Sequence, residues 1–337
     1  MKRFFKKLAW FILPCMAIVG TVIYLDFFKV FFDYDEYYSE DLFVSINREY
    51  VCLKTLEEKD KSEKPDSFIF GSSRSQAFKC KDWKKFLPDS SIAFHFDAAN
   101  EALIGVLSKL EYLEKNKISI DNVLLIVDVG LLNQTSFKKR NTSLTISPPK
   151  ISSNSEIDFY QPFITASLNP KFVISYIDFK TFRIHRGYMG QYIANTIYAN
   201  IIDSNDMDIY YGKEIEIFND SISYYEKTIK SGIFYDRSIK VIDTSDINKN
   251  TEEQLKKIEK IFENNKTNYK IVVSPMYDQI GLNKSYLNLL NGIFKNENVY
   301  DYSGVNEFTN SLGNFYEKSH YRPHLAREIM HQVYLDL

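Results

Sequence analysis

Short apolar segments alternate with longer amphipathic segments over much of the chain after residue 66. A short apolar run between turn signals predicts a buried strand, whereas apolar residues three and four positions apart predict a helix. Strands are predicted at 68–70, 91–96, 122–130, 269–277 and 299–304, and helices at 75–87, 101–116, 251–265, 284–296 and 324–337. Strands separated by single helices are typical of an α/β fold with a doubly wound sheet.

Local signals add detail to this pattern. The strand NVLLIVDVG at 122–130 is apolar throughout, as expected for a parallel strand covered on both faces. The string Thr251-x-x-Gln254 predicts the start of the helix at 251–265. Between about 131 and 240 the alternation lapses into Asn, Ser and Tyr-rich segments. We predict that this stretch is an insertion of helices and loops that caps the fold.

The N-terminus predicts a membrane anchor. A basic cluster, MKRFFKK, precedes an uncharged apolar stretch from Leu8 to Leu25, which is long enough to span a bilayer. Basic residues before the span favour a cytoplasmic N-terminus and an exported body. We expect a cytoplasmic stub and transmembrane helix at 1–28, a juxtamembrane connector at 29–65 and the main domain at 66–337. A cleaved signal peptide and a buried core helix are the alternatives.

Composition narrows the functional classes. Apolar residues make up 45% of the chain, enough for a large core, and the net charge of −2 gives no case for nucleic-acid binding. Cys52 and Cys80 lie outside the predicted span, and their pairing stays open, while Cys15 lies within it. No His/Cys cluster has metal-site spacing, so no metal or cofactor is expected.

Candidate chemistry begins at FIFGSSRSQ, where a predicted strand runs into a polar turn. Polar residues at the carboxyl end of such a strand are well placed for ligands or catalysis, although helix capping by serine is the commoner role. A serine nucleophile also needs a base that accepts its proton. His320 follows Glu317 by three residues just before the last predicted helix, so this segment offers both a base and a carboxylate that orients it.

These motifs, Gly71-Ser72-Ser73-Arg74 and Glu317-Lys318-Ser319-His320, resemble those of the SGNH (GDSL-like) hydrolases. The chain looks more closely like membrane-anchored SGNH-like proteins of cell-envelope polysaccharide gene clusters, and more distantly like the protein D family of teichoic-acid D-alanylation. The resemblance implies a flavodoxin-like three-layer sandwich around a parallel sheet. It also implies a triad of Ser73, His320 and Glu317, with Glu in place of the commoner Asp.

The resemblance is weaker at the expected oxyanion hole. The family has a Gly after the second strand, where this chain has Ala98 and Ala99 followed by Asn100, and a Gly-x-Asn after the third, where it reads VDVGLLN. Backbone N–H groups can serve without glycine. The oxyanion or substrate candidates are therefore Gly71, Arg74, Ala99, Asn100 and Asn133.

Other assignments compete with these. Ser72 is the alternative nucleophile, and His324 the alternative base. Arg74 either binds an anionic glycan or pairs with a local acid, and Asp128 is either a ligand-side carboxylate or a turn acid. His95 and His185 are read as a strand histidine and an insertion histidine without an assigned role.

The resemblance implies transfer of an acyl group, such as acetyl, to a cell-envelope polysaccharide outside the cytoplasmic membrane. A multi-spanning membrane O-acyltransferase is the implied partner. An esterase or deacetylase of the same glycans is the alternative enzyme. A catalytically silent protein that binds glycan or acts as a scaffold for the acyltransferase is the alternative from another class.

Overall fold

A computed structural model describes residues 1–38, 43–44, 46–59, 63–137, 144–190, 193–194, 199–201, 204–237 and 241–335. At its centre lies a five-stranded sheet in which every pairing is parallel. Its strands are β2 (Ser67–Phe70), β3 (Ala93–His95), β4 (Asn122–Val127), β9 (Asn268–Val273) and β11 (Val299–Asp301). The order β3-β2-β4-β9-β11 is 2-1-3-4-5 in chain order, one of the common doubly wound arrangements. The predicted α/β fold with a parallel sheet is confirmed.

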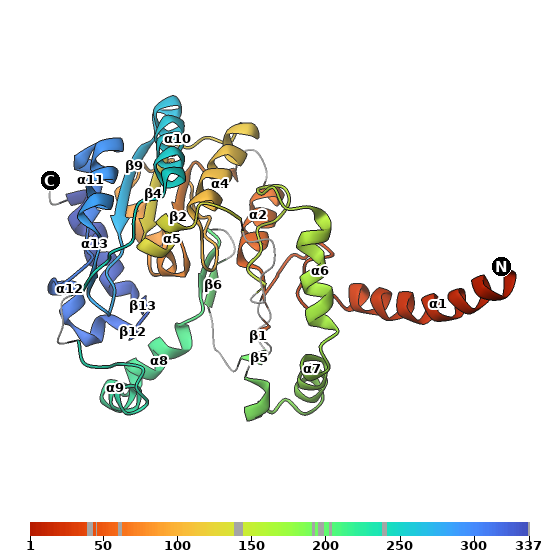
Figure 1. The fold of residues 1–337 in the computed structure, drawn as a ribbon. Helices are drawn as coiled ribbons and strands as arrows, with labels where there is room; N and C mark the ends of the chain where they lie inside the picture. The colour runs from red at the N-terminus through yellow and green to blue at the C-terminus, as the bar shows by residue number, and fades with distance from the viewer. Residues whose placement is uncertain are drawn as a thin grey trace.

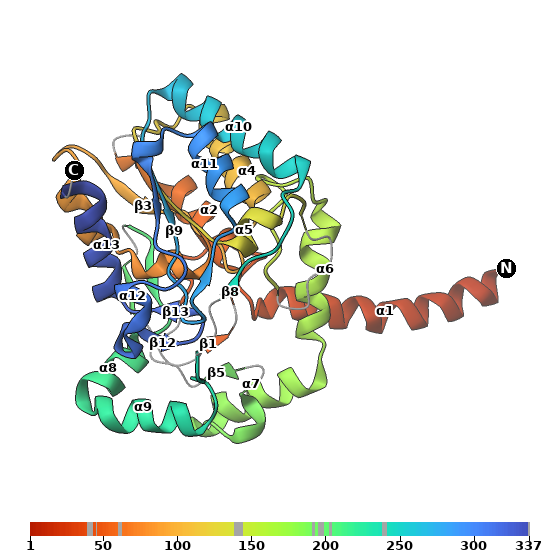
Figure 2. The same ribbon diagram turned by 60° about the vertical axis from the view of Figure 1, so that its left-hand side comes forward.

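Helices cover both faces of this sheet, which gives three layers (Figures 1 and 2). One face is covered by α4 (Leu103–Lys115), α10 (Lys249–Asn265) and α11 (Lys284–Ile293), and the other by α3 (Cys80–Trp83) and α13 (Pro323–Leu335). Side chains alternate between the two cores, since Phe68 and Phe70 belong to the first and Ile69 to the second. All six residues of β4 are buried, as expected for a central parallel strand.

The helices predicted at 75–87 and 251–265 differ from the structure in ways that tertiary contacts explain. The helix expected at 75–87 is broken into η2 (Ser73–Ala77), α3 and η3 (Lys84–Phe86), because Phe78 is extended and completely buried between them. The helix expected at 251 begins at Lys249, with Asn248 as its N-cap. Thr251 is buried inside the helix, where its hydroxyl donates to the Leu132 carbonyl at 3.1 Å.

Helices and short strands fill much of the segment where we predicted an insertion. They are α5 (Val129–Asn133), α6 (Glu156–Ser167), α7 (Pro170–Phe182), η4 (Gly187–Met189), β5 (Ile193–Ala194), β6 (Ala199–Ile201), β7 (Asp206–Asp208), α8 (Tyr211–Asn219), α9 (Ser221–Lys230) and β8 (Val241–Ile242). Parts of this prediction, at 138–143, 191–192, 195–198, 202–203 and 238–240, lie outside the described residues. The predicted boundaries at 131 and 240 stay a prediction.

The remaining elements precede β2 or follow β9 along the chain. They are β1 (Phe43–Val44), α2 (Arg48–Glu58), β10 (Ile280–Gly281), η5 (Asn296–Asn298), α12 (Glu307–Asn310), η6 (Leu312–Asn314), β12 (Phe315–Glu317) and β13 (His320–Tyr321). The predicted connector at 29–65 includes β1 and α2, but its residues 39–42, 45 and 60–62 lie outside the described ones. β12 and β13 form an antiparallel hairpin immediately before α13.

The N-terminal helix α1 (Lys2–Leu25) projects from the body (Figure 1). Its stretch from Arg3 to Leu25 is long and apolar enough to cross a membrane or to act as a signal sequence. The chain turns at Asp26, whose carboxylate accepts N–H groups of Val30 and Phe31, each at 2.9 Å. This turn joins α1 to the aromatic cluster around α6 and α7.

Candidate active site

The predicted nucleophile turn follows β2 directly. Gly71 adopts φ +153°, and a Cβ at this position would lie 2.8 Å from the Ile126 carbonyl oxygen of β4. Only glycine fits this approach without a shift of backbone. Ser72 is buried after it, while Ser73 is half-buried at the start of η2. The turn therefore presents Ser73 at the carboxyl edge of the sheet, where the strand order changes direction.

Ser73 lies beside His320 and Glu317. The Ser73 Oγ is 2.7 Å from His320 Nε2, and His320 Nδ1 is in hydrogen-bond contact with Glu317 Oε1. The β12–β13 hairpin creates this contact because a register shift sets Glu317 opposite His320. The Ser319 N–H donates to the second Glu317 oxygen at 3.0 Å.

Glu317 remains a carboxylate in this setting. Burial alone would raise the pKa of Glu317, but the hydrogen bond from His320 and the Ser319 N–H together lower it below its ordinary value. A charged carboxylate at Nδ1 fixes the imidazole tautomer and leaves Nε2 free to accept a proton. The hydroxyl, imidazole and carboxylate thus have the order and contacts that a serine nucleophile requires.

Arg74 pairs with a local acid. Its guanidinium forms an ion pair with Asp128 at 2.6 Å and donates to the Ser319 carbonyl at 3.1 Å. Asp128 also caps α5 by accepting the Leu131 N–H at 3.1 Å. Arg74 therefore links the nucleophile turn, the end of β4 and the residue before His320. Asp128 serves both as a turn acid and as the partner of Arg74.

A pocket of about 490 Å³ opens beside Ser73. Its wall includes Ser72, Ser73, Arg74, Asn100, Asp128 and His320 on the polar side and Val129, Leu131, Val273, Met276, Ile280 and Leu282 on the apolar side. The arrangement offers a polar end at the serine and an apolar region beyond it, as small-molecule sites commonly do.

The residues predicted to form the oxyanion hole do not all lie at the pocket. Asn100 lines the pocket and has a left-handed backbone, with φ +59°. The Ala98 N–H donates to the Gly71 carbonyl at 3.3 Å, so that amide is already used, and Ala99 lies between the two. Asn133 is directed elsewhere, since its side-chain oxygen accepts a hydrogen bond from Tyr286 and it does not line this pocket.

The competing residues are engaged elsewhere. Ser72 Oγ lies 3.5 Å from Asp128, with no imidazole beside it among the contacts described. His324 Nε2 meets the Asn314 side chain at 2.9 Å, and His185 Nε2 meets the Ile193 carbonyl at 2.8 Å. The geometry therefore favours Ser73 over Ser72, and His320 over His324.

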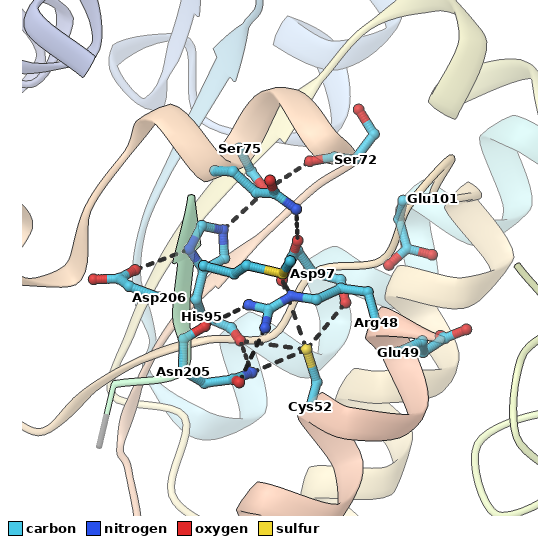
Figure 3. A network of polar contacts seen from close by, with 12 residues as sticks. Arg48, Glu49, Cys52, Ser72, Ser75, His95, Asp97, Glu101, Asn205 and Asp206 are labelled. Carbon is cyan, nitrogen blue, oxygen red and sulfur yellow. Dashed lines mark hydrogen bonds and ion pairs between the residues drawn. The ribbon is translucent and has the colours of Figure 1, made fainter. Parts of the chain in front are cut away.

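A second serine, histidine and aspartate align beneath the turn (Figure 3). Ser75 Oγ lies 3.0 Å from His95 Nε2, and His95 Nδ1 lies 3.1 Å from Asp206 Oδ1. All three residues are at most 2% exposed, and the Ser75 hydroxyl already donates to the Ser72 carbonyl. No substrate can reach this serine, so the group holds the nucleophile turn to the segment before α8.

The same buried group includes potential metal ligands. Donor atoms of Cys80, His95 and Asp206 lie within 4.8 Å of one another. Hydrogen bonds already occupy both His95 ring nitrogens, and Asp206 accepts the Cys80 N–H at 2.8 Å. The donor set is satisfied by protein groups. Cys52 and Cys80, whose pairing the sequence left open, are both free and buried thiols.

An ion pair extends this network toward α2. Arg48 donates through Nε to Asp97 at 2.8 Å and through its other nitrogens to Asn205, as Figure 3 shows. Burial alone would raise the pKa of Asp97, but Arg48 and His95 lower it to about 2. Helix α2, the segment after β3 and the residue before β7 thus meet at one buried charged pair.

Sequence reasoning missed one residue at the site, Tyr210. Its hydroxyl lies 2.7 Å from His320 Nδ1, and its ring centroid is 4.6 Å from the imidazole centroid. Tyr210 precedes α8 and is 110 positions away from His320 along the chain. No local motif marks it among the tyrosines of the insertion.

Neither protein-family models nor curated proteins match the sequence.

Proposed function

We propose that the protein is a membrane-tethered, SGNH-like acyl-ester enzyme with Ser73, His320 and Glu317 as its catalytic triad. The observation that carries this proposal is the chain of contacts from Ser73 Oγ through His320 to Glu317, next to a pocket at the carboxyl edge of a parallel sheet. A buried structural triad would not place its serine in a pocket wall.

The chemistry proceeds in two acyl transfers. The Ser73 hydroxyl gives its proton to His320 Nε2 as Oγ bonds to the acyl carbonyl carbon, while Glu317 stabilises the imidazolium. The resulting oxyanion collapses, the ester C–O bond breaks, and His320 returns the proton to the leaving oxygen. An acceptor hydroxyl then loses its proton to His320 and attacks the acyl-serine, which releases Ser73 with its hydrogen restored.

Backbone amides supply the oxyanion donors in this scheme. The amide of Ser73 heads η2, and first-turn N–H groups lack intrahelical acceptors. The second donor comes from the turn at Ala99 and Asn100, since Asn100 lines the same pocket. Donors aimed at a developing oxyanion each contribute about 10²-fold or more in rate.

The acceptor and the location rest on the resemblance of the two motifs. They favour transfer of an acyl group such as acetyl to a cell-envelope polysaccharide, with a multi-spanning O-acyltransferase as partner. In this arrangement α1 crosses the cytoplasmic membrane with its N-terminus inside, and the α/β body lies outside. The same site with water as acceptor would be an esterase.

One observation favours a non-catalytic scaffold as the second candidate. Asn133, which follows β4 one residue beyond the family's Gly-x-Asn spacing, is held by Tyr286 away from the pocket. A scaffold would bind glycan or the acyltransferase without using Ser73 as a nucleophile. The two candidates therefore differ in whether the Ser73 hydroxyl reacts.

Substitution of the two neighbouring serines tests this difference. We expect Ser73→Ala to abolish labelling by a fluorophosphonate probe and acylation of the envelope polysaccharide in cells. Ser72→Ala is the matched control and should keep most of both, because Ser72 Oγ contacts Asp128 rather than a base. Normal acylation by a stable, correctly located Ser73→Ala protein would leave only the scaffold.

A further inference from the structure

Tyr210 reaches the proposed catalytic base from a distant part of the chain. Besides its 2.7 Å contact with His320 Nδ1, its ring stacks on Tyr316 at 5.2 Å with an interplanar angle of 18°. Lys213 lies over the same ring, 4.8 Å from the centroid. The phenol is therefore held from several sides beside the imidazole.

The position of the protons limits what Tyr210 can do. If His320 Nε2 is to accept the Ser73 proton, the ring hydrogen must sit on Nδ1. Among the described residues, the oxygens that contact Nδ1 belong to Glu317 and Tyr210. Burial and the nearby Glu317 charge raise the pKa of Tyr210, so its phenol stays neutral. A neutral phenol oxygen can accept the Nδ1–H without taking the proton.

We propose that Tyr210 is a positioning residue that shares the His320 Nδ1–H with Glu317 and thereby directs Nε2 at Ser73. This inference rests on the proposed function, because it assigns Tyr210 a role only if His320 is the base. It makes the segment before α8 a component of the site rather than a cover over it.

The segment before α8 is fixed close to the nucleophile turn. Asp206 accepts the Cys80 N–H at 2.8 Å, and Asp208 pairs with Lys79 at 3.3 Å. The Tyr210 N–H then donates to Asp208 at 3.0 Å. These bonds tie the backbone that carries Tyr210 to residues that follow the nucleophile turn closely. A shift of this segment would change both sides of the Ser73–His320 pair together.

The effect of Tyr210→Phe is compared in the presence of Glu317 and in a Glu317→Ala variant. This comparison distinguishes a shared hydrogen bond from simple packing of the ring. On full-length protein in detergent micelles, we expect Tyr210→Phe to slow fluorophosphonate labelling about 5-fold when Glu317 is present. In a Glu317→Ala background the same change should cost about 50-fold, because Nδ1–H then loses its last oxygen acceptor at this site. With p-nitrophenyl acetate the loss should fall on kcat while KM stays unchanged.

The controls distinguish this inference from the proposal on which it rests. Tyr211→Phe, at the neighbouring residue that is 43% exposed, should label at the wild-type rate. Three outcomes would overturn the positioning role while leaving the proposed function in place. They are equal effects of Tyr210→Phe with and without Glu317, faster labelling, and a loss of labelling that follows a lowered melting temperature. Wild-type protein that does not label at Ser73 would overturn the proposed function and this inference with it.

Discussion

At the scale of single residues, Gly71 decides how the nucleophile turn leaves β2. Its φ of +153° and the 2.8 Å gap between a built Cβ and the Ile126 oxygen leave no room for a side chain. The next neighbour is also close, since Ser75 Cβ would lie 2.9 Å away. Ser75 in turn bonds to His95, so a shift at Gly71 would spread into the buried network.

Gly71→Ala should therefore destabilise the fold by about 3 kcal/mol, because overpacking adds to a strained backbone. The measurement is thermal unfolding followed by circular dichroism, together with the rate of Ser73 labelling. Gly292→Ala, in the last turn of α11, is the matched control, since nothing lies within 4 Å of its built Cβ and alanine has a higher helix propensity than glycine. Equal melting temperatures for the two variants would contradict this account.

Ser73 and His320 could be found from sequence because each belongs to a short motif with a clear chemical reason. Tyr210 could not, because its role depends on a contact across 110 positions and on the packing of Tyr316. Asn133 shows the opposite case, a residue that the sequence suggested for the site but that lies away from it. Its place after β4 suggested a donor, but α5 directs it to Tyr286.

At the scale of elements, apolar patterning predicted the sheet well, because buried parallel strands must be apolar on both faces. β4 and β9 lie where the sequence predicted strands. The segment after Ser73 was mispredicted because tertiary contacts override its helical pattern. Phe78 enters the core in an extended conformation, and Asp206, 126 residues away, accepts the Cys80 N–H at the start of α3.

The buried pair of Arg48 and Asp97 joins α2 to the segment after β3, and it should control acid stability. Asp97 has a pKa of about 2, below its ordinary 3.8, so the stabilisation is complete above about pH 5 and is lost as the pH falls toward 2. This difference corresponds to about 2 kcal/mol. Removal of either charge would also leave its partner buried and unpaired.

We expect the free energy of unfolding to fall by about 2 kcal/mol less between pH 5 and pH 2 in Asp97→Asn than in the wild type. Urea unfolding at each pH, followed by circular dichroism, measures this difference. Asp89→Asn removes an exposed carboxylate and should keep the wild-type pH dependence. Identical pH profiles for Asp97→Asn and wild type would show that the pair does not govern acid stability.

At the scale of the whole molecule, α1 differs from the rest of the chain in how much apolar surface it exposes. Large apolar side chains such as Trp10 and Phe11 are about 70% exposed along it, whereas Val22, near its end, is 6% exposed against the body. Exposed apolar surface on this scale is typical of a helix that inserts into lipid, contacts a partner or acts as a signal sequence. The helix therefore has a free part up to about residue 20 and a last turn that belongs to the folded body.

This division defines the truncation that tests the anchor. Deletion of residues 2–20 keeps Val22, the Asp26 turn and Phe28, which is 5% exposed in the aromatic cluster with α6 and α7. We expect the shortened protein to leave washed membranes while its melting temperature and Ser73 labelling rate stay unchanged, because residues 3–20 are exposed except for the partly buried Val19. Deletion of residues 1–28 is the informative comparison, since it also removes the turn and should lower the melting temperature.

The orientation is tested on the intact chain with a C-terminal reporter that is active only after export. Full-length protein in the soluble fraction would refute the anchor, and a reporter active only in the cytoplasm would refute the proposed exported body.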